Sequence, residues 1–300
     1  MRRAVVSAAV AVVLGSALVG CSGAAGQGGK LRVVAAENVW GSIASQLGGG
    51  RVDVTSVIVS PATDPHDYEP NAADARTLAG AQLVIVNGIG YDPWASKLLA
   101  ANPVNGREVL TVGDLVGVKP GGNPHRWYSP ADVAKVSAAI TKEYARFDRK
   151  DGDYFAARKQ RFEGRALARY KHLIASIRRT YRGVPVGASE SIFVPLAEAL
   201  GLRLLTPPSF LKAISEGADP TAKDKTTIDR QIARHEIRVW VYNSQNSTPD
   251  VARLTAAARK AGIPVVTITE TPTPASASFE DWQSRQLAVL AAALGKAKRR

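Results

Sequence analysis

The chain alternates between short apolar runs and longer segments in which apolar and polar positions are mixed. Short apolar runs predict buried strands, and apolar positions three or four residues apart predict helices that cover them. In the first half, this pattern predicts strands over Leu31–Ala36, Val52–Val59, Leu83–Val86 and Glu108–Val112. Helices are predicted between them, over Gly41–Leu47, Ala72–Ala79 and Pro93–Ala101. Such alternation favours a parallel sheet with helices on both faces.

The second half has the same organisation. Strands are predicted over Val184–Ala188, Leu202–Leu205, Val239–Tyr242 and Ile263–Ile268. Helices are predicted over Ile192–Leu200, Thr227–Arg234, Pro249–Ala261 and Phe279–Leu294. Between the halves, residues 151–182 contain no proline, and their apolar positions fall near a helical repeat. We therefore predict an α/β fold of two small parallel-sheet lobes, residues 30–149 and 183–300, joined by one long helix over residues 150–182.

The beginning of the chain has the features of an export signal. A charged start, Met1-Arg2-Arg3, precedes an apolar run that ends near Val19 and is too short for a membrane span. The stretch Leu18–Cys21 resembles the bacterial lipobox, whose cysteine becomes lipid-modified. We predict a signal peptide over residues 1–21, lipidation at Cys21, a flexible tether over residues 22–29 and a lipid-anchored protein on the extracytoplasmic face of the cell membrane.

The net charge of +13 raises the question of a nucleic-acid partner. Lysines and arginines are scattered, with dense runs only around Arg158–Arg182 and Lys296–Arg300, and aromatic residues do not interleave with them. That pattern lacks the stacking platform of a nucleic-acid binder. A solvated basic face is the interpretation we favour, and attraction to anionic headgroups or envelope polymers is the alternative.

Two loops carry the candidate histidines. His66 lies in Asp64–Pro70, where bracketing prolines favour an extended backbone after a strand. Asn71 is suited to cap the helix that follows. His125 lies in a second proline-containing loop, in which Ser129 is a good N-cap and the proline after it suits the first helical position. Both histidines are therefore expected beside helix starts, where an open α/β sheet presents ligand groups.

Two carboxylates follow strands of the second half. Glu190 comes directly after Val184–Ala188, and Glu270 follows Ile263–Ile268. Since open α/β sheets bind ligands at the carboxyl ends of strands, one cleft between the lobes is able to collect all the candidate groups. Two imidazoles and two carboxylates suit a closed tetrahedral site, with bonds of about 2.0–2.2 Å for zinc. The candidate metal ligands are His66, His125, Glu190 and Glu270.

The local motifs add a resemblance to a known family. The stretches concerned are Asp64–Pro70, Asn87–Asp92, Asn123–Trp127, Ser189-Glu190 and Thr269–Thr271. In this order they resemble the metal-binding lipoproteins of bacterial zinc and manganese ABC importers, solute-binding protein family 9 (cluster A-I). The resemblance implies two lobes joined by a rigid long helix and a monomeric, non-enzymatic carrier. It also implies one divalent ion as cargo, held by the four residues named above, and an ABC permease as partner.

The motifs leave the metal open between Zn²⁺ and Mn²⁺. The zinc-dedicated branch commonly has a third histidine where this chain has Glu190, and a histidine-rich loop where Asp114–Gly122 is short and lacks histidine. Two carboxylates make the site harder and favour manganese. The Irving–Williams order nevertheless favours zinc binding by the isolated protein.

Two alternative functions remain. A zinc hydrolase needs an open coordination position and a general base, but the chain has no His-Glu-x-x-His motif. An adhesin or scaffold would use the metal only as a structural staple, which chelation tests. The two further histidines, His172 and His235, lie in predicted helical regions, and no site role is expected for them.

Overall fold

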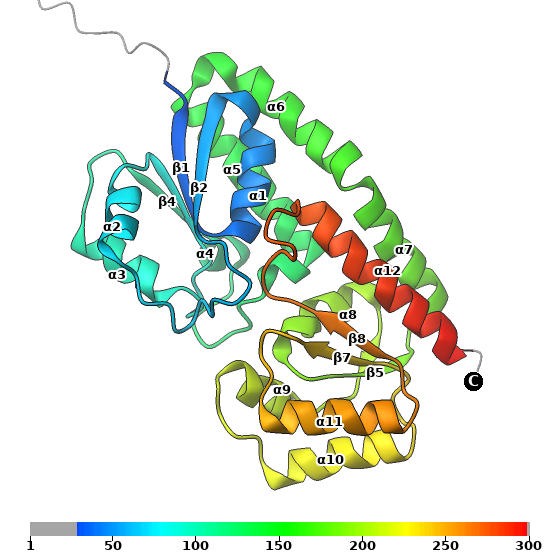
Figure 1. The fold of residues 1–300 in the computed structure, drawn as a ribbon. Coiled ribbons are helices and arrows are strands. Elements are labelled where there is room, and N and C mark those ends of the chain that lie inside the picture. Colours follow the sequence, from blue (N-terminus) through cyan, green and yellow to red (C-terminus); the bar gives the residue numbers. More distant parts are fainter. Residues whose placement is uncertain (1–28, 299–300) are drawn as a thin grey trace, which may run out of the picture.

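The computed structural model describes residues 29–298 (Figure 1). The predicted signal peptide, the lipidation site Cys21 and nearly all of the predicted tether lie outside the described residues. None of the helices over residues 29–298 combines the length and the hydrophobicity of a membrane-spanning segment.

The N-terminal lobe is a four-stranded parallel sheet in the order β2-β1-β3-β4. Its strands are β1 (Leu31–Glu37), β2 (Val52–Ile58), β3 (Leu83–Val86) and β4 (Glu108–Thr111). Every residue of β3 is buried, as expected for an inner strand covered on both faces. The helices of this lobe are α1 (Asn38–Gly48), α2 (Ala72–Ala79), α3 (Pro93–Ala101), α4 (Val112–Val116) and α5 (Pro130–Phe147).

The C-terminal lobe repeats this architecture with the strand order β6-β5-β7-β8, again all parallel. Its strands are β5 (Pro185–Ala188), β6 (Arg203–Leu204), β7 (Trp240–Asn243) and β8 (Val265–Ile268). Its helices are α8 (Val194–Leu200), α9 (Pro208–Ser215), α10 (Ala222–Ala233), α11 (Pro249–Lys260) and α12 (Phe279–Lys298). The predicted fold class of two parallel-sheet α/β lobes is confirmed.

The segment between the sheets is helical but not one uninterrupted α-helix. It consists of α6 (Gly152–Arg161) and α7 (Ala168–Tyr181), separated by a π-helical turn over Phe162–Ala166. The N–H of Leu167 donates to the carbonyl of Phe162 at 2.9 Å, which closes the wider turn. The turn contains Gly164, a poor α-helix former. Figure 1 shows α6 and α7 running along one side of both lobes, with α12 packed beside α7.

The largest apolar core runs through both lobes and the linking helices. It includes Trp40 and Trp127 from the N-terminal lobe, Phe193 from the C-terminal lobe, and Phe162 and Tyr170 from the linker. Two smaller cores lie elsewhere, one within each lobe. Because one core is shared, the two lobes are packed against each other as well as tied by the chain.

Helices α4, α9 and α10 also differ from the sequence-based expectation. Helix α9 was not predicted, α10 begins five positions before the predicted Thr227, and α4 occupies part of a predicted loop. The predicted caps are confirmed. The Asn71 side chain accepts from the N–H groups of Ala73 and Asp74, and the Ser129 hydroxyl accepts from the N–H of Asp132.

Candidate metal centre

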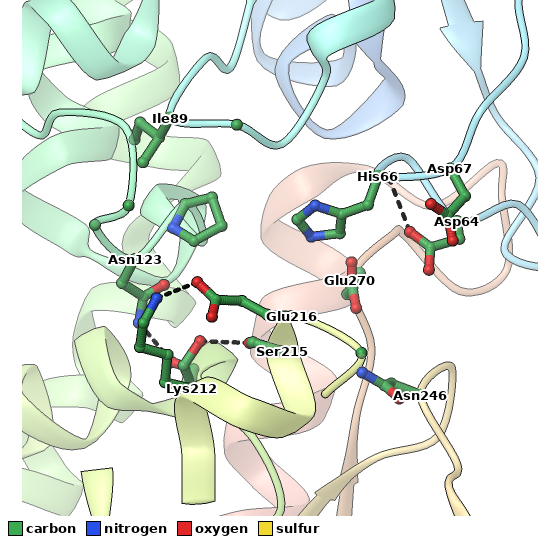
Figure 2. A pocket seen from close by; sticks show the side chains of 16 residues that line it. Asp64, His66, Asp67, Ile89, Asn123, Lys212, Ser215, Glu216, Asn246 and Glu270 are labelled. Atoms are coloured by element: carbon green, nitrogen blue, oxygen red, sulfur yellow. Dashed lines mark hydrogen bonds and ion pairs between the residues drawn. The ribbon is translucent and has the colours of Figure 1, made fainter. Parts of the chain in front are cut away.

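His66 lies in the loop that joins β2 to α2. Its backbone N–H donates to Oδ1 of Asp64 at 2.9 Å, and the loop ends in the Asn71 capping box. The imidazole is half-buried and packs edge-on against the Tyr91 ring, with 4.8 Å between centroids. The proline-bounded loop and this aromatic contact hold the ring at the mouth of the cleft. Figure 2 shows it directed toward Glu270.

His125 lies in the loop before α5 and is fully buried. Its Nδ1 is 2.9 Å from Oδ1 of Asn123, and the Asn123 amide nitrogen donates to the carbonyl of Ser191 at 2.6 Å. Since the second bond orients the amide, Oδ1 is the atom that faces His125, and an amide oxygen only accepts. Nδ1 therefore carries the proton, and Nε2 presents a lone pair. This Nε2 has no hydrogen-bond partner among the described residues.

The two glutamates are buried at the carboxyl ends of β5 and β8, with 2% and 8% of Glu190 and Glu270 exposed. The side-chain amide of Asn243, the last residue of β7, donates to Oε2 of Glu190 and to Oε1 of Glu270, each at 2.8 Å. The Ser215 hydroxyl donates to Oε1 of Glu190 at 3.0 Å, and the Tyr91 hydroxyl donates to Oε2 of Glu270 at 2.9 Å. Three adjacent strand ends of the C-terminal lobe thus form one polar network.

The four predicted site residues come together between the lobes. One ligand atom each from His66, His125 and Glu270 lie within 4.8 Å of one another. Nε2 of His125 is 3.6 Å from Oε1 of Glu190, which places the fourth residue against the same group. A cleft of about 440 Å³ leads to them, and its lining includes His66 and Glu270 (Figure 2). The group of His66, His125 and Glu270 has the size and the donor atoms that a single cation requires, and Glu190 adjoins it through His125.

Burial sets the protonation of these groups. Desolvation, followed by the nearby Glu270 charge, raises the pKa of Glu190 to about 8. Burial also raises the pKa of Glu270, although the hydrogen bond from Tyr91 opposes the shift. Desolvation lowers the pKa of His125 well below its usual range, and the neighbouring His66 adds to this. At neutral pH the 3.6 Å contact therefore joins a neutral imidazole to a carboxyl group that is mostly protonated, not two ions.

Several residues of the site were not found from the sequence. Tyr91 lies within a motif that the sequence singled out, but no role was assigned to it. Asn243 stands directly at a strand end, the same signal that identified Glu190 and Glu270, and it was overlooked because amides are common in loops. Ser215 belongs to the unpredicted helix α9. His172 and His235 are exposed on the surface, outside this group.

Comparisons with known proteins agree with the fold. A family model described as the periplasmic zinc-uptake complex component A, ZnuA, matches residues 33–293. The metal ABC transporter substrate-binding lipoprotein FimA of Streptococcus parasanguinis is 24% identical over 265 residues, covering 80% of this chain and 81% of that protein. The manganese ABC transporter substrate-binding lipoprotein PsaA of Streptococcus pneumoniae is 23% identical over 243 residues, covering 73% and 74%.

A solved structure extends the likeness to three dimensions. A periplasmic metal binding protein from Candidatus Liberibacter asiaticus aligns with a TM-score of 0.71 at 20% identity, covering 88% of this chain and all of that one. The shared feature at this level of identity is the two-lobed fold. The family expected from the local motifs is confirmed by the match to residues 33–293.

Proposed function

The chain belongs to the zinc-uptake complex component A family, and we propose that it captures a divalent transition-metal ion and delivers it to an ABC permease. The observation that carries this proposal is the convergence of two imidazoles and two carboxylates, half from each lobe, at the base of one cleft. The function is that of a carrier rather than an enzyme, because the metal is cargo and all four groups are used to hold it.

We assign the ligands as His66, His125, Glu190 and Glu270. The buried Nε2 of His125 supports this assignment, since an unsatisfied buried acceptor is costly and a cation would satisfy it. The pair formed by Asn123 and His125 supports it too, because an outer partner on the other ring nitrogen is the usual arrangement for a ligating histidine. Burial raises the pKa of both carboxyl groups, and a dication compensates their charges when they ionise.

The four candidate ligands lie at different depths in the cleft, and this sets the order in which an entering ion meets them. His66 and Glu270 line the cleft, whereas His125 and Glu190 are buried and do not belong to its lining. An incoming ion therefore meets one histidine and one glutamate first, and then the deeper pair. The proton of Glu190 leaves as the ion binds, so that the buried site never holds two uncompensated negative charges.

The cargo is Zn²⁺ or Mn²⁺. The name of the family refers to zinc uptake, whereas the relative PsaA is named as a manganese ABC transporter substrate-binding lipoprotein. The relatives are named as lipoproteins, which supports anchoring at Cys21 on the extracytoplasmic side of the membrane. We propose that the carrier acts as a monomer. The same names support an ABC permease as partner. We assign residues 30–149 to the N-terminal lobe of the carrier, residues 150–182 to the linker and residues 183–300 to the C-terminal lobe.

Titration calorimetry with zinc and with manganese tests the ligand assignment. Purified protein freed of metal is expected to bind one ion per chain, and His66→Ala and His125→Ala are expected to weaken binding of both metals. His172→Ala is the matched control, because His172 is exposed on the linking helix. Full affinity in His66→Ala would contradict the assignment. Unfolding on chelation would favour the structural-staple alternative, since a carrier keeps its fold without cargo and reloads.

A further inference from the structure

The orientation of the Asn243 side chain is fixed on every side. The residue is fully buried, and its backbone N–H donates to the hydroxyl of Ser189 at 3.0 Å. Its side-chain Oδ1 accepts from the backbone N–H of Gln245 at 3.0 Å. Because the oxygen is taken by a backbone donor, the amide nitrogen must face the other way, toward Glu190 and Glu270. Asn243 is therefore a rigid double donor between the two carboxyl groups.

Each carboxyl oxygen at the site accepts one hydrogen bond. For Glu190 the donors are Asn243 and Ser215, and for Glu270 they are Asn243 and Tyr91. To chelate an ion through both oxygens, a carboxylate has to turn so that both face one point. Asn243 opposes this rotation in both glutamates at once, because its two N–H bonds point in fixed directions.

We propose that Asn243 is a specificity-determining residue that restricts Glu190 and Glu270 to one metal-facing oxygen each, and so favours zinc over manganese. The inference rests on the proposed function and deepens it. One atom from each of four residues makes a four-coordinate site, which is the geometry that zinc adopts in closed protein sites. Manganese prefers more oxygen ligands, and two glutamates fixed in this way do not provide them.

The two carboxylates have two opposite effects on the choice between zinc and manganese. Two carboxylates make the site harder, which favours manganese, but carboxylates restrained by a shared donor give fewer oxygens, which favours zinc. The amide also lowers the repulsion between the two glutamates by donating to both. Its removal is therefore expected to lower the preference for zinc over manganese, in addition to any general loss of affinity.

The experiment compares wild type, Asn243→Ala and Tyr91→Phe, each purified as the chain from residue 22 onward, which contains both lobes and the linker. Competition titrations with zinc and manganese give the ratio of the two affinities. We expect this ratio to fall about tenfold in Asn243→Ala, at the lower end of the ~10–100-fold effect of partners that orient ligands. Tyr91→Phe frees one oxygen of Glu270 alone and is expected to shift the ratio less, in the same direction.

Cobalt(II) provides a readout that does not depend on affinity, because its visible absorption is strong in four-coordinate sites and weak in sites of higher coordination. Cobalt-loaded wild type is expected to absorb strongly, and Asn243→Ala to lose intensity. Asn246→Ala is the matched control, since Asn246 lines the same cleft but donates to the carbonyl of Ile214.

The outcomes are distinguishable. A wild-type chain that binds neither zinc nor manganese would overturn the proposed function, and the inference with it. A wild type that binds both metals, with an unchanged ratio in Asn243→Ala or weak cobalt absorption before mutation, would overturn the inference alone. If Asn243→Ala fails to fold, Asn243→Ser takes its place, because serine keeps a polar side chain but has one O–H and cannot donate to both glutamates: an unchanged ratio in that variant would refute the restraint.

Discussion

Replacing Glu190 by glutamine tests the protonation of the metal-free site. Glutamine has the shape of a protonated glutamate, and its carbonyl oxygen is able to accept from Asn243 as Oε2 does in the wild type. The variant loses a ligand and is expected to bind metal weakly. In the metal-free protein, by contrast, it removes a buried group that is costly to ionise.

The size of the effect follows from the pKa of Glu190, about 8 in the folded protein against an ordinary value of 4.5. Because folding raises the pKa of Glu190, the protonated group makes its full contribution to the unfolding free energy at pH values below the pKa of the unfolded chain. This contribution is lost as the pH rises toward 8, the pKa in the folded protein. Between pH 5 and pH 7 the wild type should lose about 2–3 kcal/mol of unfolding free energy through this group. Glu190→Gln has no such loss, so its stability relative to wild type should rise by that amount.

Urea denaturation of metal-free protein at the two pH values measures this difference, with a chelator present throughout. Glu216→Gln is the matched control, because Glu216 lines the same cleft but its side chain is 51% exposed and paired with Lys212. The difference in unfolding free energy between Glu216→Gln and wild type should change little from pH 5 to pH 7. If Glu190→Gln gains nothing on wild type between pH 5 and pH 7, Glu190 is already ionised in the metal-free protein, and the reasoning is refuted.

Three further predictions concern the same site and its loops. Metal binding at pH 7 should release about one proton, seen as a binding enthalpy that depends on the ionisation heat of the buffer, because Glu190 has to ionise; buffer-independent heat would contradict this. Asn123→Ala should weaken zinc affinity ~10–100-fold in competition titrations by releasing the His125 tautomer. Asn71→Ala should lower the urea-measured unfolding free energy by about 1 kcal/mol through loss of the α2 cap, and an unchanged value would exclude that role.

The strands and the candidate ligands were accessible from the sequence because both depend on local rules. Buried parallel strands read as short apolar runs, and residues that follow such runs lie at one edge of the sheet. This reasoning made His66, His125, Glu190 and Glu270 the candidate ligands, and their role as metal ligands stays a prediction. The caps at Asn71 and Ser129, predicted from the sequence, are confirmed.

What the sequence did not reveal depends on neighbours distant in the chain. Helix α9 was not predicted, although Pro208 occupies its first turn, where proline is favoured. Helix α10 begins early because Thr221 caps it with its hydroxyl. The bridging role of Asn243 requires three strand ends to be neighbours, and strand order is not written in any local pattern.

The apolar core shared by the lobes and the linking helices has a consequence for unloading. A hinge opening wide enough to part the deeper ligands would expose large side chains such as Trp127 and Phe193, which are completely covered. The loop that carries His66 is covered far less and can move without disturbing them. We therefore expect that the proposed permease unloads the ion by displacing the loop that carries His66, while the two lobes stay packed against each other.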